Sequence, residues 1–124
     1  MRLSFEHLLA LAGAVGISLI HVARASDIQL GMFTESGPNL FSALILSSIF
    51  ELSLPSNFKR RAWLSSELSL LLHLIYECLQ NCAPSLFTFD IADIMASALG
   101  AYLGSFLKKR LLCVASSHYS KWNQ

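Results

Sequence analysis

Charged residues are scarce in this chain of 124 residues, of which they make up 14 %. Ordinary soluble domains contain about 25 % charged residues. Apolar residues make up 54 % of the chain, and the mean hydropathy is +0.54. So few charges argue against a soluble bundle of several helices, and so apolar a chain argues against intrinsic disorder. The formal net charge of +1 provides no field that would attract nucleic acid.

Catalytic and metal-binding motifs are missing as well. The chain has no glycine-rich phosphate loop, no HExxH and no GxSxG. Its three cysteines are Cys78, Cys82 and the distant Cys113, which make no disulfide framework. The serines show no spacing that would mark a nucleophile with its base and orienting group. We therefore expect no enzyme activity, no cofactor and no metal site.

Four mostly apolar stretches come close to the length of about 20 residues that a membrane-spanning helix needs. They are residues 5–23, 39–54, 62–80 and 91–107. The sequence therefore predicts an all-α, multi-span transmembrane helical bundle of about four helices. We expect one domain over residues 1–124, with a basic tail at 108–124.

The placement of lysine and arginine predicts the orientation. Eight of the nine basic residues fall on one side of a chain with four spans, and Arg24 alone lies in the first loop. The positive-inside rule then places both termini in the cytoplasm. A soluble helical bundle with a basic end is the alternative. The first stretch has a second interpretation as a cleaved signal peptide, because Ala23-Arg24-Ala25 resembles a small-residue cleavage site.

Polar residues recur on one face of the third stretch, at intervals of three or four residues. They are Ser66, Ser69, His73, Glu77 and Gln80. With about 3.6 residues per turn, this spacing places them on one stripe of a helix. Glu67 lies off the stripe, and we expect a basic partner for it in Arg60 or Arg61. For Glu51, in the second stretch, we expect water or the loop at 59–61 as partner.

The fourth stretch carries a matching stripe of polar and small residues. They are Asp93, Ser97, Gly100 and Gly104. The two glycines form a GxxxG pattern, which permits close approach of two helices. We expect this face to pack against the polar face of the third stretch. If it faces outward instead, it predicts a homo-oligomer. Asp90 is expected to cap the fourth helix.

The predicted orientation brings the candidate site residues together near the extracytoplasmic surface. They are Glu77, Gln80, Asp90, Asp93, Ser97 and, about one turn deeper, His73. Three interpretations stay open. The residues form a structural hydrogen-bond clip between two helices, a site for a small headgroup or ion that opens outward, or a proton relay through His73 and Glu77.

The same segment carries a sequence pattern of four parts. It has a Glu-x-x-Gln pair (Glu77-Cys-Leu-Gln80), the loop proline Pro84, an acidic step (Phe89-Asp90-Ile-Ala-Asp93) and the two glycines. In order and approximate spacing, residues 77–104 resemble the VanZ-like family of small bacterial membrane proteins. The family's loop arginine is missing, Ser97 stands in place of its asparagine, and its upstream Asp-Lys-x-x-His element has no clear counterpart.

The resemblance implies a multi-pass protein of the bacterial cytoplasmic (inner) membrane with a role in tolerance of teicoplanin-type glycopeptides. It implies membrane lipids, a lipid-linked envelope precursor or a lipoglycopeptide as partners. Because the loop arginine is missing, either Glu77 is protonated or Arg24 takes the place of that arginine. With the first stretch retained, we expect Arg24 to lie near Glu77 and Asp93. The alternatives are a small transporter or proton-coupled membrane subunit, which would need to oligomerise, and a structural membrane scaffold without a site.

Overall fold

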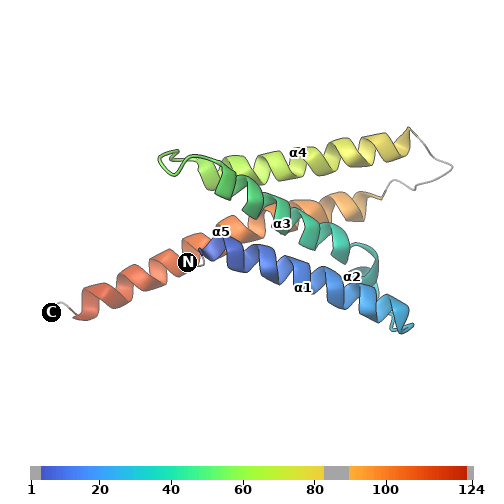
Figure 1. Cartoon of the computed structure of the whole chain (residues 1–124), viewed down its shortest axis with the longest axis horizontal. Coiled ribbons are helices and arrows are strands. Elements are labelled where there is room, and N and C mark those ends of the chain that lie inside the picture. Colours follow the sequence, from blue (N-terminus) through green and yellow to red (C-terminus); the bar gives the residue numbers. More distant parts are fainter. Residues whose placement is uncertain (1–3, 83–89, 123–124) are drawn as a thin grey trace.

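The computed structural model describes residues 4–82 and 90–122, with the side chains of residues 4–80, 82 and 90–111. The described chain is all-α, as predicted (Figure 1). Its helices are α1 (Phe5–Ala25), α2 (Met32–Glu35), α3 (Gly37–Ser53), α4 (Arg61–Asn81) and α5 (Ile91–Trp122). Three residues of the sequence patterns, Arg2, Pro84 and Phe89, lie outside the described residues.

The four long helices match the predicted stretches to within two residues, except at the C-terminal end of α5. There the helix continues through the predicted basic tail, because residues 108–122 contain no glycine or proline to end it. The short helix α2 lies in a segment that we expected to be a loop. Pro38 stands in the first turn of α3, where a proline is pre-organised for helix and no hydrogen bond is lost.

The long helices alternate in direction, so their termini gather at two opposite ends of the bundle (Figure 1). We call one the basic end; it holds the start of α1, residues 54–60 and Lys108. We call the other the acidic end; it holds residues 26–36, the end of α4 and the start of α5.

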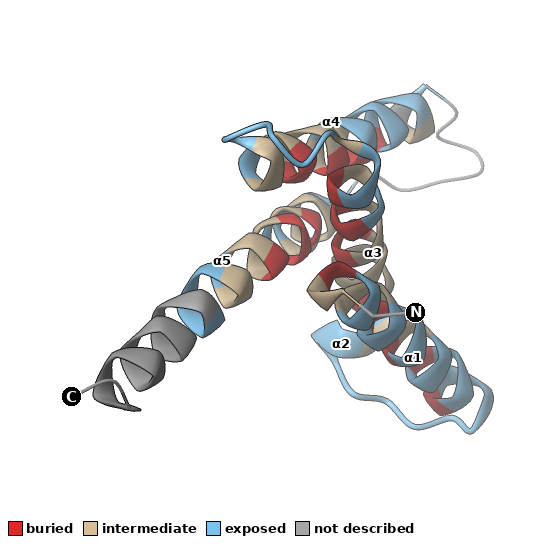
Figure 2. Ribbon diagram, turned by 60° about the vertical axis from the view of Figure 1, so that its left-hand side comes forward, coloured by how far each residue is buried: buried red, intermediate tan, exposed pale blue. Residues whose placement is uncertain are grey.

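Helix α3 lies at the centre and packs against α1, α4 and α5, with α1 and α4 on opposite sides of it (Figure 2). Glycines permit these contacts. A Cβ atom on Gly16 would meet the ring of Phe41, and one on Gly100 would meet the backbone carbonyl of Leu40. Gly104 faces α1 and α3. The expected packing of the two α5 glycines against α4 is therefore wrong, because both approach α3.

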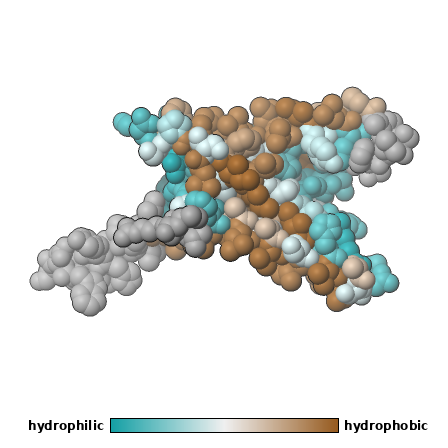
Figure 3. Space-filling view, in the orientation of Figure 1, coloured by the Kyte–Doolittle hydropathy of each residue, from teal (hydrophilic) through white to brown (hydrophobic). Residues whose placement is uncertain are grey.

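The bundle is polar inside and apolar outside. The largest fully buried side chains are small and polar, namely Ser65, Ser66, Ser69 and Ser97. Large apolar side chains point outward instead; Leu11 and Leu19, for example, are 60 % and 64 % exposed. Figure 3 shows these apolar residues as a band over the middle, with hydrophilic residues toward the ends. This distribution is the reverse of that in a water-soluble protein, which buries its large apolar side chains.

Length and composition single out one helix in the described part of the chain. Helix α1, near the N-terminus, is long and apolar enough to cross a membrane by itself. A signal sequence has the same properties. Helix α3 is shorter, at 17 residues, and α4 carries the polar stripe.

Candidate functional site

The polar stripe of α4 faces the interior of the bundle. Ser66 and Ser69 are fully buried, His73 and Glu77 are 8 % and 3 % exposed, and Gln80 is half-buried. The predicted stripe is thus one buried face of a single helix, and its members differ in what they bond to.

The two serines clip α4 to its neighbours. The hydroxyl of Ser66 donates to the carbonyl of Ala101 at 2.8 Å and pairs with the hydroxyl of Ser105 at 2.9 Å, both on α5. The hydroxyl of Ser69 donates to the carbonyl of Ala43 on α3 at 2.9 Å. The bonds of Ser66 and Ser69 are of the kind expected if the stripe is a structural hydrogen-bond clip between helices.

His73 extends this clip. Its Nδ1 lies 2.9 Å from the carbonyl oxygen of Ser69, and its Nε2 lies 2.9 Å from the hydroxyl of Ser42 on α3. Because a carbonyl only accepts hydrogen bonds, Nδ1 carries a hydrogen and donates it. Both ring nitrogens therefore have partners inside the bundle. The same side chain borders a cavity of about 450 Å³ between α1, α3 and α4, which His21 and Tyr76 also line.

Glu77 lies one turn further along α4 and differs from the rest of the stripe. Its Oε2 atom is buried and has no hydrogen-bond partner in the described part of the chain. Asp93, Asp90 and His73 lie close enough to act on its carboxylate, which also accepts a hydrogen bond from the backbone of Asp90. The structure thus brings four of the predicted site residues together. We refer to Glu77, Asp90 and Asp93 as the acidic cluster.

One residue of the acidic cluster also caps a helix, and the remaining candidate residues lie beside the cluster. Asp90 caps α5 as predicted, since its Oδ1 accepts a hydrogen bond from the amide of Ala92 at 2.8 Å. Ser97 is buried one turn below Asp93 on α5, and Gln80 follows Glu77 by one turn on α4. Among the described residues, no group of three or more histidines, cysteines or acidic residues is arranged to hold a metal ion.

The acidic end has an excess of negative charge. Five of the eight acidic residues lie there, and one of the nine basic residues. The acidic ones are Asp27, Glu35, Glu77, Asp90 and Asp93.

Arg24, the basic residue at this end, is bonded elsewhere. Its guanidinium donates to the carbonyl of Thr34 at 2.8 Å from Nε and to the carbonyl of Glu35 at 3.3 Å. The expected position of Arg24 beside Glu77 and Asp93 is therefore wrong. The reason is that α1 and α4 end on opposite sides of α3 (Figure 1).

A network of four charged residues closes the basic end, and of its contacts the sequence predicted only that of Glu51 with the loop at 59–61. Glu6 and Glu51 are buried, and each contacts both Arg61 and Lys108. The Arg61 contacts measure 3.4 Å to Glu6 and 3.5 Å to Glu51. A signal was present, because each residue lies near an end of a predicted stretch and the alternation of helices brings those ends together. Burial alone would lower the pKa of Lys108, but hydrogen bonds and attraction from the two carboxylates raise it above its usual value.

The sequence predicted a partner for Glu51 and a basic partner for Glu67, and only the first prediction agrees with the structure. Glu51 finds one in the predicted loop residue Arg61. Glu67 accepts a hydrogen bond from the hydroxyl of Tyr102 on α5, so the expectation of a basic partner is wrong. Arg61 is occupied by the network at the basic end.

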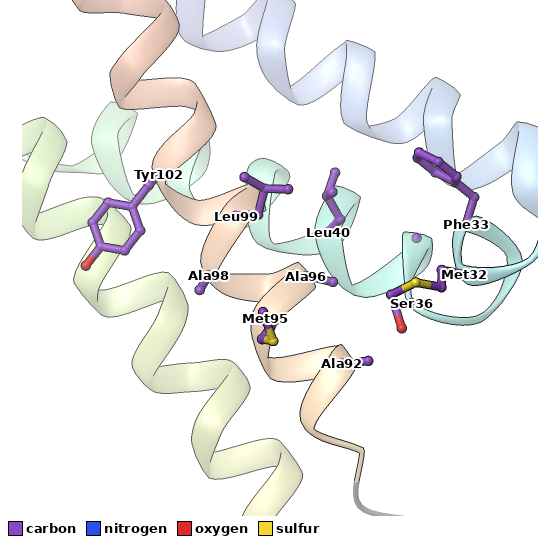
Figure 4. A pocket seen from close by; sticks show the side chains of 11 residues that line it. Met32, Phe33, Ser36, Leu40, Ala92, Met95, Ala96, Ala98, Leu99 and Tyr102 are labelled. Carbon is purple, nitrogen blue, oxygen red and sulfur yellow. The ribbon is translucent and has the colours of Figure 1, made fainter.

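An apolar groove of about 700 Å³ opens between α5 and the segment that joins α2 to α3 (Figure 4). Met32, Phe33 and Leu40 line one wall, and Met95 and Leu99 line the other. No residue of the acidic cluster is among those that line it. The groove and the cluster are therefore separate features.

Comparison of the chain with protein-family models, with curated proteins and with solved structures found no match.

Proposed function

We propose that this chain is an integral membrane protein whose four long helices all cross the bilayer, α5 as far as Leu107, with the basic end in the cytoplasm. The observation that carries the proposal is the reversed distribution of polarity, with serines, His73 and glutamates inside and large apolar residues outside. In a bilayer, polar groups must find their partners within the protein. The clip between α3, α4 and α5 meets that requirement.

Two further features support four spans rather than one. A helix in a bundle needs an apolar surface only where it faces lipid, so the inward polar stripe of α4 lowers its mean hydropathy without exposing polar groups. The basic end also carries most of the lysines and arginines, as expected for a cytoplasmic face.

Helix α1 is part of the proposed mature bundle rather than a cleaved signal. Its Gly13 and Gly16 fit closely against Ile45 and Phe41 of α3, and its Glu6 belongs to the charged network. Removal of α1 would expose the face of α3 that packs against it. It would also take one carboxylate, that of Glu6, from the charged network. Mass spectrometry of the mature protein tests this, since a new N-terminus at Ser26 would contradict it.

The proposed role is that of a VanZ-like protein of the cell envelope that raises tolerance of teicoplanin-type glycopeptides. The resemblance in residues 77–104 includes all three residues of the acidic cluster. In the proposed orientation this cluster lies at the outer surface, at the level of the lipid headgroups. There it would alter how a lipoglycopeptide or a lipid-linked envelope precursor sits in the membrane.

Cysteine labelling in intact cells tests the orientation. The three native cysteines are replaced by serine, and single cysteines are introduced as Gln29→Cys at the acidic end and Asn57→Cys at the basic end. Both positions are exposed. A maleimide that cannot cross membranes should label the first in intact cells and the second only after permeabilisation. Labelling of both in intact cells, or release of the protein from membranes by alkaline carbonate, would overturn the four-span proposal.

Antibiotic susceptibility tests the role. A Gram-positive host that expresses the chain should show raised tolerance of teicoplanin but not of vancomycin, with insertion confirmed by blot. The Glu77→Gln variant should lose the effect, and Glu35→Gln, an exposed acid at the same end, should keep it. Unchanged susceptibility with inserted protein would contradict the proposed role and leave the membrane topology standing.

A further inference from the structure

We propose that the acidic cluster of Glu77, Asp90 and Asp93 binds a primary ammonium group, R–NH3⁺. This inference rests on the proposed function, because the orientation of the bundle places the cluster at the outer membrane surface. It adds the chemical class of the ligand, which the resemblance does not specify.

The first observation is the unsatisfied oxygen of Glu77. In the described part of the chain, its Oε2 is the one buried side-chain oxygen or nitrogen that lacks a hydrogen-bond partner. Natural proteins satisfy nearly all such atoms, and an exception calls for a specific reason. The stripe that carries Glu77 follows the rule elsewhere, since Ser66, Ser69 and His73 all have partners. The deficit is therefore confined to the acidic cluster.

The second observation is the sign of the surroundings. Asp93 and Asp90 act on Glu77 as like charges, and these outweigh the favourable effects of His73 and of a hydrogen bond from the Asp90 backbone. Arg24, the basic residue of this end, is committed to the carbonyls of Thr34 and Glu35. Three carboxylates that repel one another, one of them buried, are stabilised by a cation that also donates hydrogen bonds.

The geometry favours an ammonium group over other cations. The carboxylates come from two helices and are not arranged as metal ligands. A primary ammonium carries three diverging N–H donors, so it can bond the free Oε2 of Glu77 and a neighbouring carboxylate without the convergence of three acidic ligands that a metal ion needs. A quaternary ammonium has no N–H donor and is recognised by aromatic cages, and the donors of a guanidinium all lie in one plane.

An ammonium of this kind has two sources at a membrane surface. It belongs either to the headgroup of an ethanolamine phospholipid or to a soluble amine. Both carry the same chemistry, so the test includes an arm for each.

The experiment uses the full chain in lipid nanodiscs and infrared difference spectroscopy of the carboxylate bands. In phosphatidylcholine nanodiscs, ethylammonium chloride should produce a saturable shift of these bands, and tetramethylammonium chloride should not. Binding should be about tenfold weaker in Glu77→Gln, as expected for loss of one charge-assisted hydrogen bond. Glu35→Gln should bind like the parent. If the lipid is the source, the shifted bands should already be present in phosphatidylethanolamine nanodiscs without added amine.

Three results would overturn the inference. One is an equal response to tetramethylammonium, which would show charge screening alone. Another is a protonated carboxyl band assigned to Glu77 that ethylammonium leaves unchanged. The last is equal binding by the parent and a folded Glu77→Gln variant, with Asp93→Asn in its place if Glu77→Gln does not fold. The cysteine labelling measures the topology separately. If the topology is as proposed but ammonium does not bind, only this inference is contradicted. Ammonium binding with incorrect topology removes the proposed orientation alone.

Discussion

Lys108 donates a hydrogen bond to Glu6, although the two residues lie 102 positions apart in the chain. The same ammonium also contacts Glu51, so a single side chain of α5 joins α1 and α3. Arg61 contacts both carboxylates from α4. Two acids and two bases thus form a neutral set that connects all four long helices at the basic end.

Replacement of Lys108 by methionine should destabilise the bundle. Methionine keeps most of the apolar stem but leaves Glu6 and Glu51 with Arg61 alone. Loss of one partner from a buried ion pair costs about 3–5 kcal/mol. The Lys108 side chain is 25 % exposed, so we expect a smaller decrease in the free energy of unfolding, about 2 kcal/mol. Unfolding in mixed micelles, followed by circular dichroism, measures it.

The neighbouring lysine provides the matched control for that measurement. Lys109 is exposed and has no part in the network, so Lys109→Met should leave the free energy of unfolding nearly unchanged. If both variants lost the same free energy of unfolding, removal of a positive charge would be the cause, and not loss of the contacts that Lys108 makes.

The raised pKa of Lys108 predicts a loss of stability at high pH. The stabilisation is fully present below the unfolded-state pKa near 10.5 and is lost as the pH rises through the higher folded-state value. Lys108→Arg keeps its charge over this range and should lose less stability than the parent above pH 10.5. Parallel curves of stability against pH for the two proteins would contradict this prediction.

Replacement of Gly100 by alanine should disrupt the contact between α5 and α3. The added Cβ would meet the backbone carbonyl of Leu40, which cannot move without shifting a helix. Overpacking of this kind costs about 1–3 kcal/mol. Gly104→Ala should cost less, because its Cβ would meet the flexible end of Leu9 at 3.2 Å. Unfolding of both variants in mixed micelles gives the comparison, and an equal or reversed order would argue against the close approach at Gly100.

Removal of the hydroxyl of Ser69 tests the structural clip. Ser69→Ala loses the hydrogen bond to the carbonyl of Ala43. For the membrane bundle that we propose, such a bond contributes about 0.6 kcal/mol on average. Ser18→Ala is the control, because that exposed hydroxyl bonds only to Ala14 of its own helix. The difference in unfolding free energy between the two variants should be positive. A value of zero would mean that the clip adds no stability.

The helices and the grouping of polar residues could be predicted from the sequence, because both depend on local periodicity. The spacing of Ser66, Ser69, His73 and Glu77 defines one face of α4 without knowledge of its neighbours. The cap by Asp90 depends on residues next to it in the chain. The alternation of helices follows from chain order, and it placed the acidic residues of α4 and α5 at one end.

The partner of each face could not be predicted, because it depends on which helices approach one another. Gly100 and Gly104 signal a close contact but do not specify α3. Arg24 shares an end of the bundle with Glu77, yet α3 separates the helices that carry them. The alternation of helices places Glu6 and Lys108 at the same end of the bundle, but it does not specify that α1 and α5 come into contact there.

The central position of α3 has a consequence for the order of assembly during synthesis. The pair of α1 and α3 emerges from the ribosome first and already carries both buried carboxylates, Glu6 and Glu51. Arg61 follows with α4, and Lys108 arrives only with the last helix. An unfinished chain therefore holds one cation for two buried carboxylates, whereas the finished chain is balanced. Completion of the network therefore marks a fully assembled bundle, because Lys108 supplies the second cation for the two carboxylates.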